Sequence, residues 1–206
     1  MRALLALMAV AAMGGCVTPE KDPRFQLGQE PEGFVMIGVA ESAANTSPDY
    51  IMLWRKIDPV TDGFAPVGGH TVFEVHTNDG GSIRVRGIPG EFEYRRLEPG
   101  TYALDSVYAI LHDRRVNYFA QGMVTGPERP SFHVGAGEAV YLGIWEMNLN
   151  ETVATGQLWR LDQTDLDAAA HAANAVNGAI TLQAAQTISA PCTPHRLSDR
   201  SQRQVC

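Results

Sequence analysis

Two histidines and a glutamate recur at short spacing in the middle of the chain, where they could bind a metal ion. His70, Glu74 and His76 are separated by even numbers of residues, so they lie on one face of an extended strand. Zinc is bound by imidazole and carboxylate groups in sites of three or four ligands. Arg84 and Arg86 follow closely and would repel a cation, so a solvated polar face is the alternative interpretation.

Other combinations that could support catalysis are sparse. The sequence lacks the G-x-S-x-G, S-x-x-K, H-E-x-x-H and P-loop motifs, and it contains no cofactor-binding motif. His112 and Asp113 are adjacent and could mimic a base and the group that orients it, although neighbours in a strand or turn seldom point the same way. These observations favour a protein that is not an enzyme.

Cys16 follows a segment that is typical of secreted bacterial proteins. Arg2 precedes the apolar residues 3–13, and two glycines come next. This apolar stretch is shorter than the ~20 residues of a membrane span, which indicates a signal peptide over residues 1–15. Small residues directly before a cysteine resemble the bacterial lipobox, although Met13 stands where that motif usually has Leu. The resemblance implies cleavage before Cys16 and acylation of its thiol and amine; the alternative is an ordinary signal peptide with Cys16 as a passenger.

An acylated cysteine would anchor the chain to a membrane, because several acyl chains together bind almost irreversibly. In lipoproteins of enteric-type bacteria an Asp after the cysteine favours retention at the inner membrane, so Val17 favours the outer membrane. Residues 16–33 hold three prolines, mixed charges and no apolar period, and they are predicted to form a flexible tether without strand or helix. Such a segment reaches about 55 Å when extended, which places the body in the periplasm or at the cell surface.

The remaining cysteines, Cys192 and Cys206, form an even pair once Cys16 carries lipid. In an oxidising periplasm such a pair predicts a disulfide, which would close a loop of about 15 residues and tie down the end of the chain. Two free thiols on a disordered tail are the alternative.

Two tryptophans are candidates for a ligand or partner surface. Tyr141 and Trp145 are predicted to share one face of a strand, and Val153 and Trp159 one face of the next strand. If that face is outward, Trp145 and Trp159 form a platform for a ligand or partner. If it is inward, they belong to the core, which is the more usual position.

Most of the chain between residues 34 and 161 is predicted to form short strands. β-Branched and aromatic runs alternate with Gly, Pro, Asn and Asp turns at the spacing of an antiparallel β-sandwich of about nine or ten strands. We expect strands at residues 34–40, 50–57, 70–76, 82–86, 91–97, 101–111, 116–122, 131–134, 138–147 and 152–161. The TNDGG loop further predicts a hairpin that pairs residues 73–76 with residues 82–85 and sets Glu74 across from Arg84. In this hairpin the apolar side chains of Phe73, Val75, Ile83 and Val85 share the opposite face.

Residues 97–143 resemble known β-sandwich modules. They contain L-x-P-G-x-Y-x-L followed by F-x-V-x-A-G-E-x-x-Y-L-G, a pattern similar to transthyretin-like and carboxypeptidase-regulatory-like sandwiches and to envelope lipoproteins built on them. The matching residues are Leu97, Pro99, Gly100, Tyr102, Leu104, Phe132, Val134, Ala136, Gly137, Glu138, Tyr141, Leu142 and Gly143. The resemblance implies a sandwich and a location in the cell envelope, and it implies no catalytic residue.

After the last predicted strand the composition becomes rich in alanine. Residues 162–178 are predicted to form one α-helix that starts at a capping box on Thr164 and stops at Asn177. The helix lacks the basic and large apolar residues of a membrane-surface helix. We therefore expect residues 162–206 to pack on the sandwich of residues 34–161.

Net charge limits the class of partner. The chain carries 16 basic and 23 acidic residues, a formal charge of −7 and a pI of about 5.3, which argues against nucleic acid held through its phosphates. The sequence predicts a lipid-anchored, non-enzymatic binding or assembly module of the bacterial envelope, in contact with the membrane through its lipid and with another envelope protein or a polymer. The alternative is an envelope hydrolase or metal-dependent enzyme whose site assembles from scattered His, Asp and Glu side chains.

Overall fold

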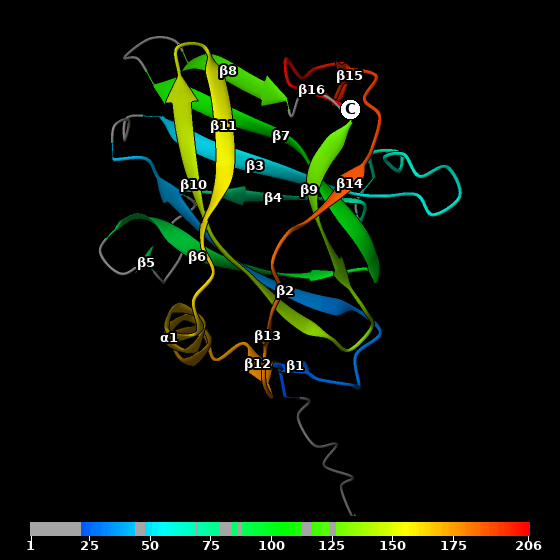
Figure 1. Ribbon diagram of the computed structural model, residues 1–206, viewed down its shortest axis with the longest axis vertical. Helices are drawn as coiled ribbons and strands as arrows, with labels where there is room; N and C mark the ends of the chain where they lie inside the picture. Colours follow the sequence, from blue (N-terminus) through cyan, green and yellow to red (C-terminus); the bar gives the residue numbers. More distant parts are fainter. Residues whose placement is uncertain are drawn as a thin grey trace, which may run out of the picture.

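Two β-sheets packed face to face form the body of the protein (Figure 1). The computed structural model describes residues 22–43, 48–68, 70–78, 84–85, 88–112, 117–123 and 127–206. In spatial order the first sheet consists of β11 (Val153–Arg160), β10 (Ala139–Asn150), β2 (Gly33–Glu41), β6 (Ile88–Leu97) and β5 (Arg84–Val85), with β13 (Thr181–Leu182) beside β10. The second sheet consists of β14 (Gln186–Ser189), β9 (Glu128–Val134), β7 (Gly100–His112), β3 (Asp49–Lys56) and β4 (Val72–His76), with β8 (Asn117–Met123) beside β7.

This architecture confirms the predicted mainly-β sandwich with one helix near the C-terminus. The strands are more numerous than the nine or ten expected, because several pairing segments contain only two residues. They include β1 (Phe25–Gln26) with β12 (Val176–Asn177), and β15 (His195–Arg196) with β16 (Gln204–Val205). Most neighbouring strands are antiparallel, whereas β10 runs parallel to β2.

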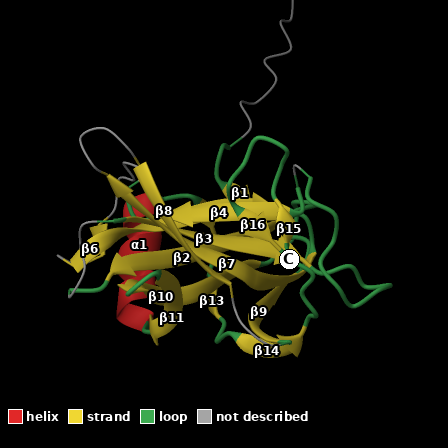
Figure 2. Ribbon diagram, turned by 90° about the horizontal axis from the view of Figure 1, so that it is seen from above, coloured by secondary structure: helices red, strands yellow, loops and turns green. Residues whose placement is uncertain are grey.

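The first sheet packs on both of its faces, which explains its long apolar runs. Strand β2 is buried along its whole length. Val35 and Ile37 point into the inner core between the two sheets, whereas Phe34 and Met36 point into a helix-side core. That second core lies between the first sheet and the helix α1 (Gln163–Ala173), which Figure 2 shows beside β10 and β11.

The outer face of the second sheet is covered by the end of the chain. Ile51, Leu53 and Tyr108 of β3 and β7 pack with the fully buried Val205 in a small tail-side core. The sandwich therefore carries a helical cover on one side and an irregular cover on the other.

Helix α1 differs from its predicted bounds at both ends. Its N-cap is Asp162, whose carboxylate accepts hydrogen bonds from the backbone N–H groups of Thr164 and Asp165, so the predicted capping box on Thr164 is wrong. The helix ends at Ala173 because Asn174 adopts the left-handed conformation with φ of 43°, which asparagine tolerates better than most residues. The chain beyond it is extended and forms β12.

The predicted hairpin between residues 73–76 and 82–85 is wrong. Strand β4 pairs with β3, and β5 pairs with β6 in the other sheet. Phe73 and Val75 are buried as expected, because a period of two decides which face of a strand is apolar but not which strand lies next to it. The carboxylate of Glu74 forms an ion pair with Arg203, and the cross-strand partner of Glu74 is Leu53 of β3.

The second half of the predicted tether is part of the folded body. Phe25 is fully buried, its strand β1 pairs with β12, and the guanidinium of Arg96 lies over its ring at 5.6 Å. The prediction that residues 16–33 contain no strand is therefore wrong for residues 22–33. Cys16 and the predicted signal peptide lie outside the described residues.

Candidate functional site

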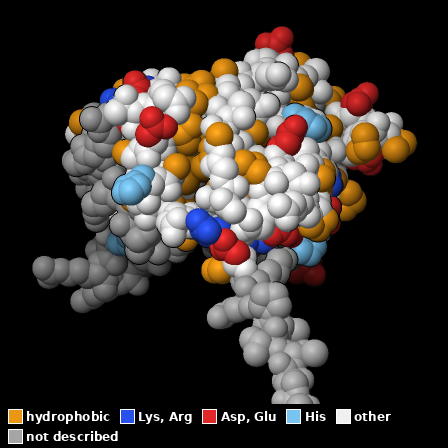
Figure 3. All heavy atoms as spheres, turned by 90° about the horizontal axis from the view of Figure 1, so that it is seen from below, with side chains coloured by type: hydrophobic (Ala, Val, Ile, Leu, Met, Phe, Trp, Pro, Cys, Tyr) orange, Lys and Arg blue, Asp and Glu red, His pale blue; other side chains and the backbone are white. Residues whose placement is uncertain are grey.

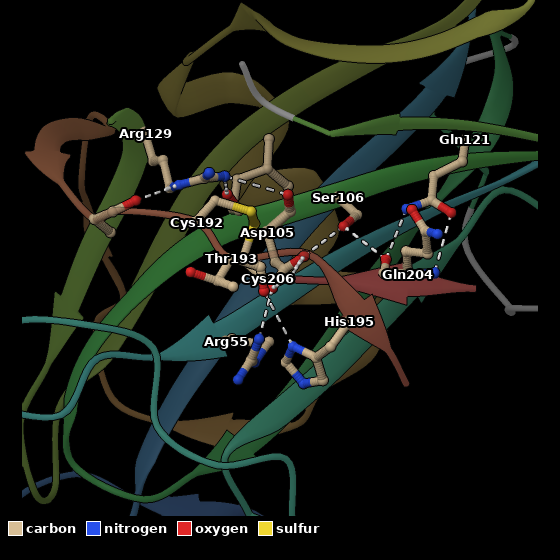
Figure 4. Close-up of a disulfide and its surroundings, with 12 residues drawn as sticks. Arg55, Asp105, Ser106, Gln121, Arg129, Cys192, Thr193, His195, Gln204 and Cys206 are labelled. Carbon is tan, nitrogen blue, oxygen red and sulfur yellow. Dashed lines mark hydrogen bonds and ion pairs between the residues drawn. A yellow bond between two sulfur atoms is a disulfide. The ribbon is translucent and has the colours of Figure 1, made fainter. Parts of the chain in front are cut away.

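The tail, residues 186–206, crosses the outer face of the second sheet and is held near both ends (Figure 4). At its start β14 pairs with β9, and the N–H of Ala190 donates a hydrogen bond to the carbonyl of Pro127 at 2.7 Å. Near its end Cys206 lies at disulfide distance from Cys192, with their Cα atoms 4.7 Å apart. The predicted cysteine pair is confirmed.

A fully buried carboxylate lies beneath the end of the tail. The Asp105 side chain accepts hydrogen bonds from the backbone N–H of Cys206 at 3.0 and 3.2 Å and from Arg55 Nη1 at 2.9 Å. The hydroxyl of Ser106 donates a further, short hydrogen bond to it. Asp105 thus ties the tail to strands β3 and β7.

An additional residue in β7 explains why Asp105 and Ser106 both face the tail. Leu53 and Trp54 are consecutive in β3, but their partners in β7 are Ser106 and Leu104, so the ladder skips Asp105. Such a β-bulge turns two successive side chains toward one face. The bulge therefore supplies the polar groups that meet the tail.

Arg129 of β9 is fully buried next to Asp105. Its Nε donates to the carbonyl of Ala190 at 2.8 Å, and its Nη1 lies 3.4 Å from the carbonyl oxygens of Leu104 and Asp105. Burial lowers the pKa of Arg129, the carboxylate of Asp105 opposes that effect, and the charge of Arg55 adds to it. Arg55, Asp105 and Arg129 are called the arginine cluster below.

Side chains of the second sheet also hold the backbone of the tail. The Tyr108 hydroxyl and Gln121 Nε2 donate to the carbonyl of Gln204 at 2.6 and 2.7 Å. In return the N–H of Gln204 donates to Gln121 Oε1 at 3.0 Å. Burial raises the pKa of Tyr108 to about 12, which keeps this hydroxyl a hydrogen-bond donor at neutral pH.

A groove of about 870 Å³ opens between the tail, the loop that follows β3, and the turn between β6 and β7. It is lined by Lys56, Ile57, Pro59, Thr61, Asp62, Pro99, Gly100, Thr101, His133, Ile188, Ser189 and Pro191. The hydroxyl of Thr101 lies 3.2 Å from His133 Nδ1, and Lys56 Nζ lies 3.0 Å from a carboxylate oxygen of Glu98. The groove thus combines aliphatic and proline side chains with a few polar groups.

The two candidate tryptophans lie on opposite faces of their sheet. Trp145 is 2% exposed and packs edge-on against Trp54 in the inner core, with ring centroids 5.4 Å apart. Leu158 is the cross-strand partner of Trp145, so the next residue, Trp159, points outward; it is 40% exposed. The tryptophans do not form a common platform.

Of the three candidate metal ligands, Glu74 and His76 lie on β4 and are engaged with other groups, whereas His70 precedes the strand. The carboxylate of Glu74 lies 2.6 Å from Arg203 Nη1 and 3.4 Å from His76 Nε2, while His70 is exposed. Burial alone would raise the pKa of Glu74, but hydrogen bonds and charges from His76 and Arg203 hold it below its ordinary value. Among the residues that the structure describes, no group of three or more His, Cys, Asp or Glu side chains could hold a metal ion.

His112 has a carboxylate partner that the sequence did not indicate. Its Nε2 makes a short contact with the carboxylate of Asp49 on β3, which also accepts a short hydrogen bond from the amide of Asn78. Asp113, the partner considered from the sequence, lies outside the described residues.

The sequence did not predict the arginine cluster or the groove, although one residue indicated a buried polar site. Asp105 interrupts an apolar run, and a carboxylate inside a buried strand needs a cationic or hydrogen-bonding partner. No sequence pattern indicates that this partner is Arg55, 50 residues away in the chain.

Comparisons with protein-family models, with curated proteins and with solved structures found no match for this chain. None of the helices in the described residues is long and apolar enough to span a membrane. The fold and the groove are therefore interpreted from their own geometry.

Proposed function

We propose that the protein is a non-enzymatic binding or assembly module of the bacterial envelope, anchored to the outer membrane by lipid on Cys16. Its sandwich faces the periplasm or the cell surface and captures a ligand or partner in the groove beside the tail. The resemblance of residues 97–143 to transthyretin-like modules agrees with this proposal. The observation that carries it is the groove.

The groove has the size and composition of a ligand site. Its volume, about 870 Å³, lies within the range of roughly 300–1,000 Å³ in which proteins hold small molecules or anchoring groups of a partner. Its two basic groups are occupied: Lys56 is paired with Glu98, and His133 contacts Thr101, while Asp62 is an exposed acid of the lining. This arrangement suits holding a ligand better than activating a nucleophile.

One wall of the groove is unusually well fixed for a chain end. Ile188 and Ser189 belong to β14, and Pro191 directly precedes the disulfide at Cys192. A binding wall that is already ordered loses less conformational entropy when a ligand binds, which favours affinity. Such stiffening of an otherwise irregular segment supports a role in recognition.

The packed N-terminal segment shortens the proposed tether. Because residues 22–33 belong to the body, the distance from Cys16 to Asp22 is at most about 20 Å in an extended chain. A body on so short a tether would keep its lower end, which carries β1, β12 and α1 in Figure 1, close to the lipid headgroups.

The charge of that end supports anchoring by lipid rather than by basic residues. Figure 3 shows the molecule from below, with few Lys and Arg side chains and with Asp and Glu side chains scattered around the face. Attraction to anionic lipids needs clusters of Lys and Arg. With a formal charge of −7, the chain would rely on its acyl groups.

Co-purification with groove variants tests the binding function. Thr101→Trp places a large ring inside the groove, whereas Val60→Trp adds the same ring at a position that is 87% exposed and outside the lining. We expect a protein, lipid or polymer to be recovered from solubilised envelopes with the wild type and Val60→Trp, and to be lost with Thr101→Trp. Recovery of nothing above background, or equal recovery with both variants, would show that the groove is not the binding site.

Metabolic labelling with an alkyne-bearing fatty acid tests the anchor. We expect label on the wild type and on the Cys192→Ser/Cys206→Ser control, and none on Cys16→Ser. Label that persists on Cys16→Ser contradicts the proposed lipidation.

A further inference from the structure

The arginine cluster contains more hydrogen-bond donors than its surroundings satisfy. Arg55 and Arg129 are 2% and 0% exposed; Arg55 forms an ion pair with Asp105, whereas Arg129 donates only to backbone carbonyls. Nε of Arg55 and Nη2 of Arg129 are buried and have no hydrogen-bond partner. A buried donor without an acceptor is costly, more so on a charged group, and native proteins retain few of them. The surplus of positive charge and of N–H groups fits an anion.

An aromatic ring on a surface loop covers both guanidinium groups. The centroid of the Phe64 ring lies 4.9 Å from Cζ of Arg55 and 5.2 Å from Cζ of Arg129. Phe64 itself is half-buried and is held by a single bridge to Ile57, while Ala65 accepts a hydrogen bond from Arg55 Nη2. The ring is thus a small, partly exposed cover over otherwise enclosed cations.

The groove and the arginine cluster occupy one face of the second sheet. On β9, His133 lines the groove and Arg129 belongs to the cluster, four residues or about 13 Å along the same side of the strand. On β7, Thr101 lines the groove and Asp105, four residues further along the same side of the strand, belongs to the cluster. The residues midway between these positions on the two strands, Ala103 and Ser131, are small and buried.

We propose that the groove binds a small amphiphilic anion, whose aliphatic part lies against Ile57 and Ile188 and whose carboxylate or phosphate reaches Arg55 and Arg129 when the Phe64 ring turns aside. This inference rests on the proposed binding function of the groove. Guanidinium N–H groups donate strong, charge-assisted hydrogen bonds to carboxylate and phosphate, and each of the two arginines has one nitrogen without an acceptor. The lysine at the rim, Lys56, is already paired with Glu98.

Calorimetry with three simple probes tests the anion site. Octanoate and octyl phosphate share the aliphatic chain of 1-octanol, which lacks the charge; each is titrated into the full chain carrying Cys16→Ser. We expect both anions to bind at least tenfold more tightly than the alcohol, and Phe64→Ala to increase the affinity of the anions but not that of the alcohol. Equal affinity for the three probes would overturn the anion site while leaving a groove that binds ligands, and binding of none of them would also overturn it.

Two variants locate the anion. Arg129→Gln is expected to abolish the preference for octanoate over octanol, and Lys56→Gln to retain a preference; the control, Arg196→Gln at an exposed position outside the groove, leaves it within about twofold. Loss of the preference in Lys56→Gln alone would place the anion at the rim and refute the inference. If Arg129→Gln does not fold, ¹⁵N spectra of the guanidinium groups are recorded on the Phe64→Ala chain with and without octanoate. We expect octanoate to shift the Arg129 Nε signal, and an unchanged signal would contradict the anion site.

Discussion

Substitution of Asp105 by Ala should destabilise the protein strongly, because this carboxylate serves two strands and the tail at once. The variant leaves Arg55 buried without its ion pair and leaves the N–H of Cys206 without an acceptor. Removing one partner of a buried pair costs about 3–5 kcal/mol, since the remaining charge stays desolvated. For a chain of this size that corresponds to a decrease in Tm of about 6–20 °C.

Urea unfolding followed by tryptophan fluorescence measures this loss, with Asp199→Ala as the control. Asp199 is an exposed acid in the same tail, and its removal should change the free energy of unfolding by less than about 0.5 kcal/mol. Asp105→Asn, which preserves the shape but removes the charge, should show most of the loss. In native-state hydrogen exchange the amide of Cys206 should exchange faster in both Asp105 variants. A loss below about 1 kcal/mol for Asp105→Ala would refute the role assigned to the cluster in holding the tail.

Three further outcomes follow from the same structure. Cys206→Ala, or reduction of the wild type, should lower the free energy of unfolding by about 3 kcal/mol in urea titrations, as expected for a closed loop of about 15 residues; no change would mean that the pair does not constrain the chain. Trp145→Ala should cost about 3–5 kcal/mol in the same assay and Trp159→Ala less than about 1 kcal/mol, because only the first ring is in the core; equal costs would contradict the assigned faces. Because the pKa of Glu74 lies below its ordinary value of 4.5, its contribution to stability is present above that pH and is lost as the pH falls through the lowered pKa. Arg203→Gln should raise that pKa in an NMR titration and reduce the difference in stability between pH 7 and pH 3, and an unchanged pKa would exclude the ion pair as a cause.

Alternation of apolar and polar residues predicted the buried face of β4, but not the positions where alternation breaks. Tyr141 and Trp145 are an even number of residues apart and were expected on one face. They lie in different cores, because Gly143 adopts φ of 81° and the register of β10 shifts against β2 at that point. A lone glycine in a strand pattern indicates a possible bulge, but not which way the following side chains turn.

Pairing partners were harder to predict than faces. The buried face of β4 was predicted correctly, but its partner strand was not. Any strand with the same alternation offers an equivalent surface, so the pattern does not select the partner. In β3, Trp54 is the cross-strand partner of Phe73, and the two rings stack with their centroids 6.3 Å apart. This contact favours the pairing of β4 with β3 over the expected hairpin of residues 73–76 with residues 82–85.

The two covers of the sandwich differ in how their backbone polar groups find hydrogen-bond partners. Helix α1 satisfies its own backbone hydrogen bonds, so it meets the first sheet through the side chains of Leu166 and Ala169 and through the ion pair of its buried Asp165 with Arg160. The tail has little regular structure, and its buried N–H and C=O groups require partners from the sheet beneath it. Asp105 and Arg129 supply those partners, and buried polar groups on the second sheet are the necessary consequence of closing it with an irregular segment. Closing the sheet in this way leaves Arg55 Nε and Arg129 Nη2 without acceptors, close to a groove with an aliphatic lining. These free donors are the reason why we propose an anionic ligand for this face and not for the helical one.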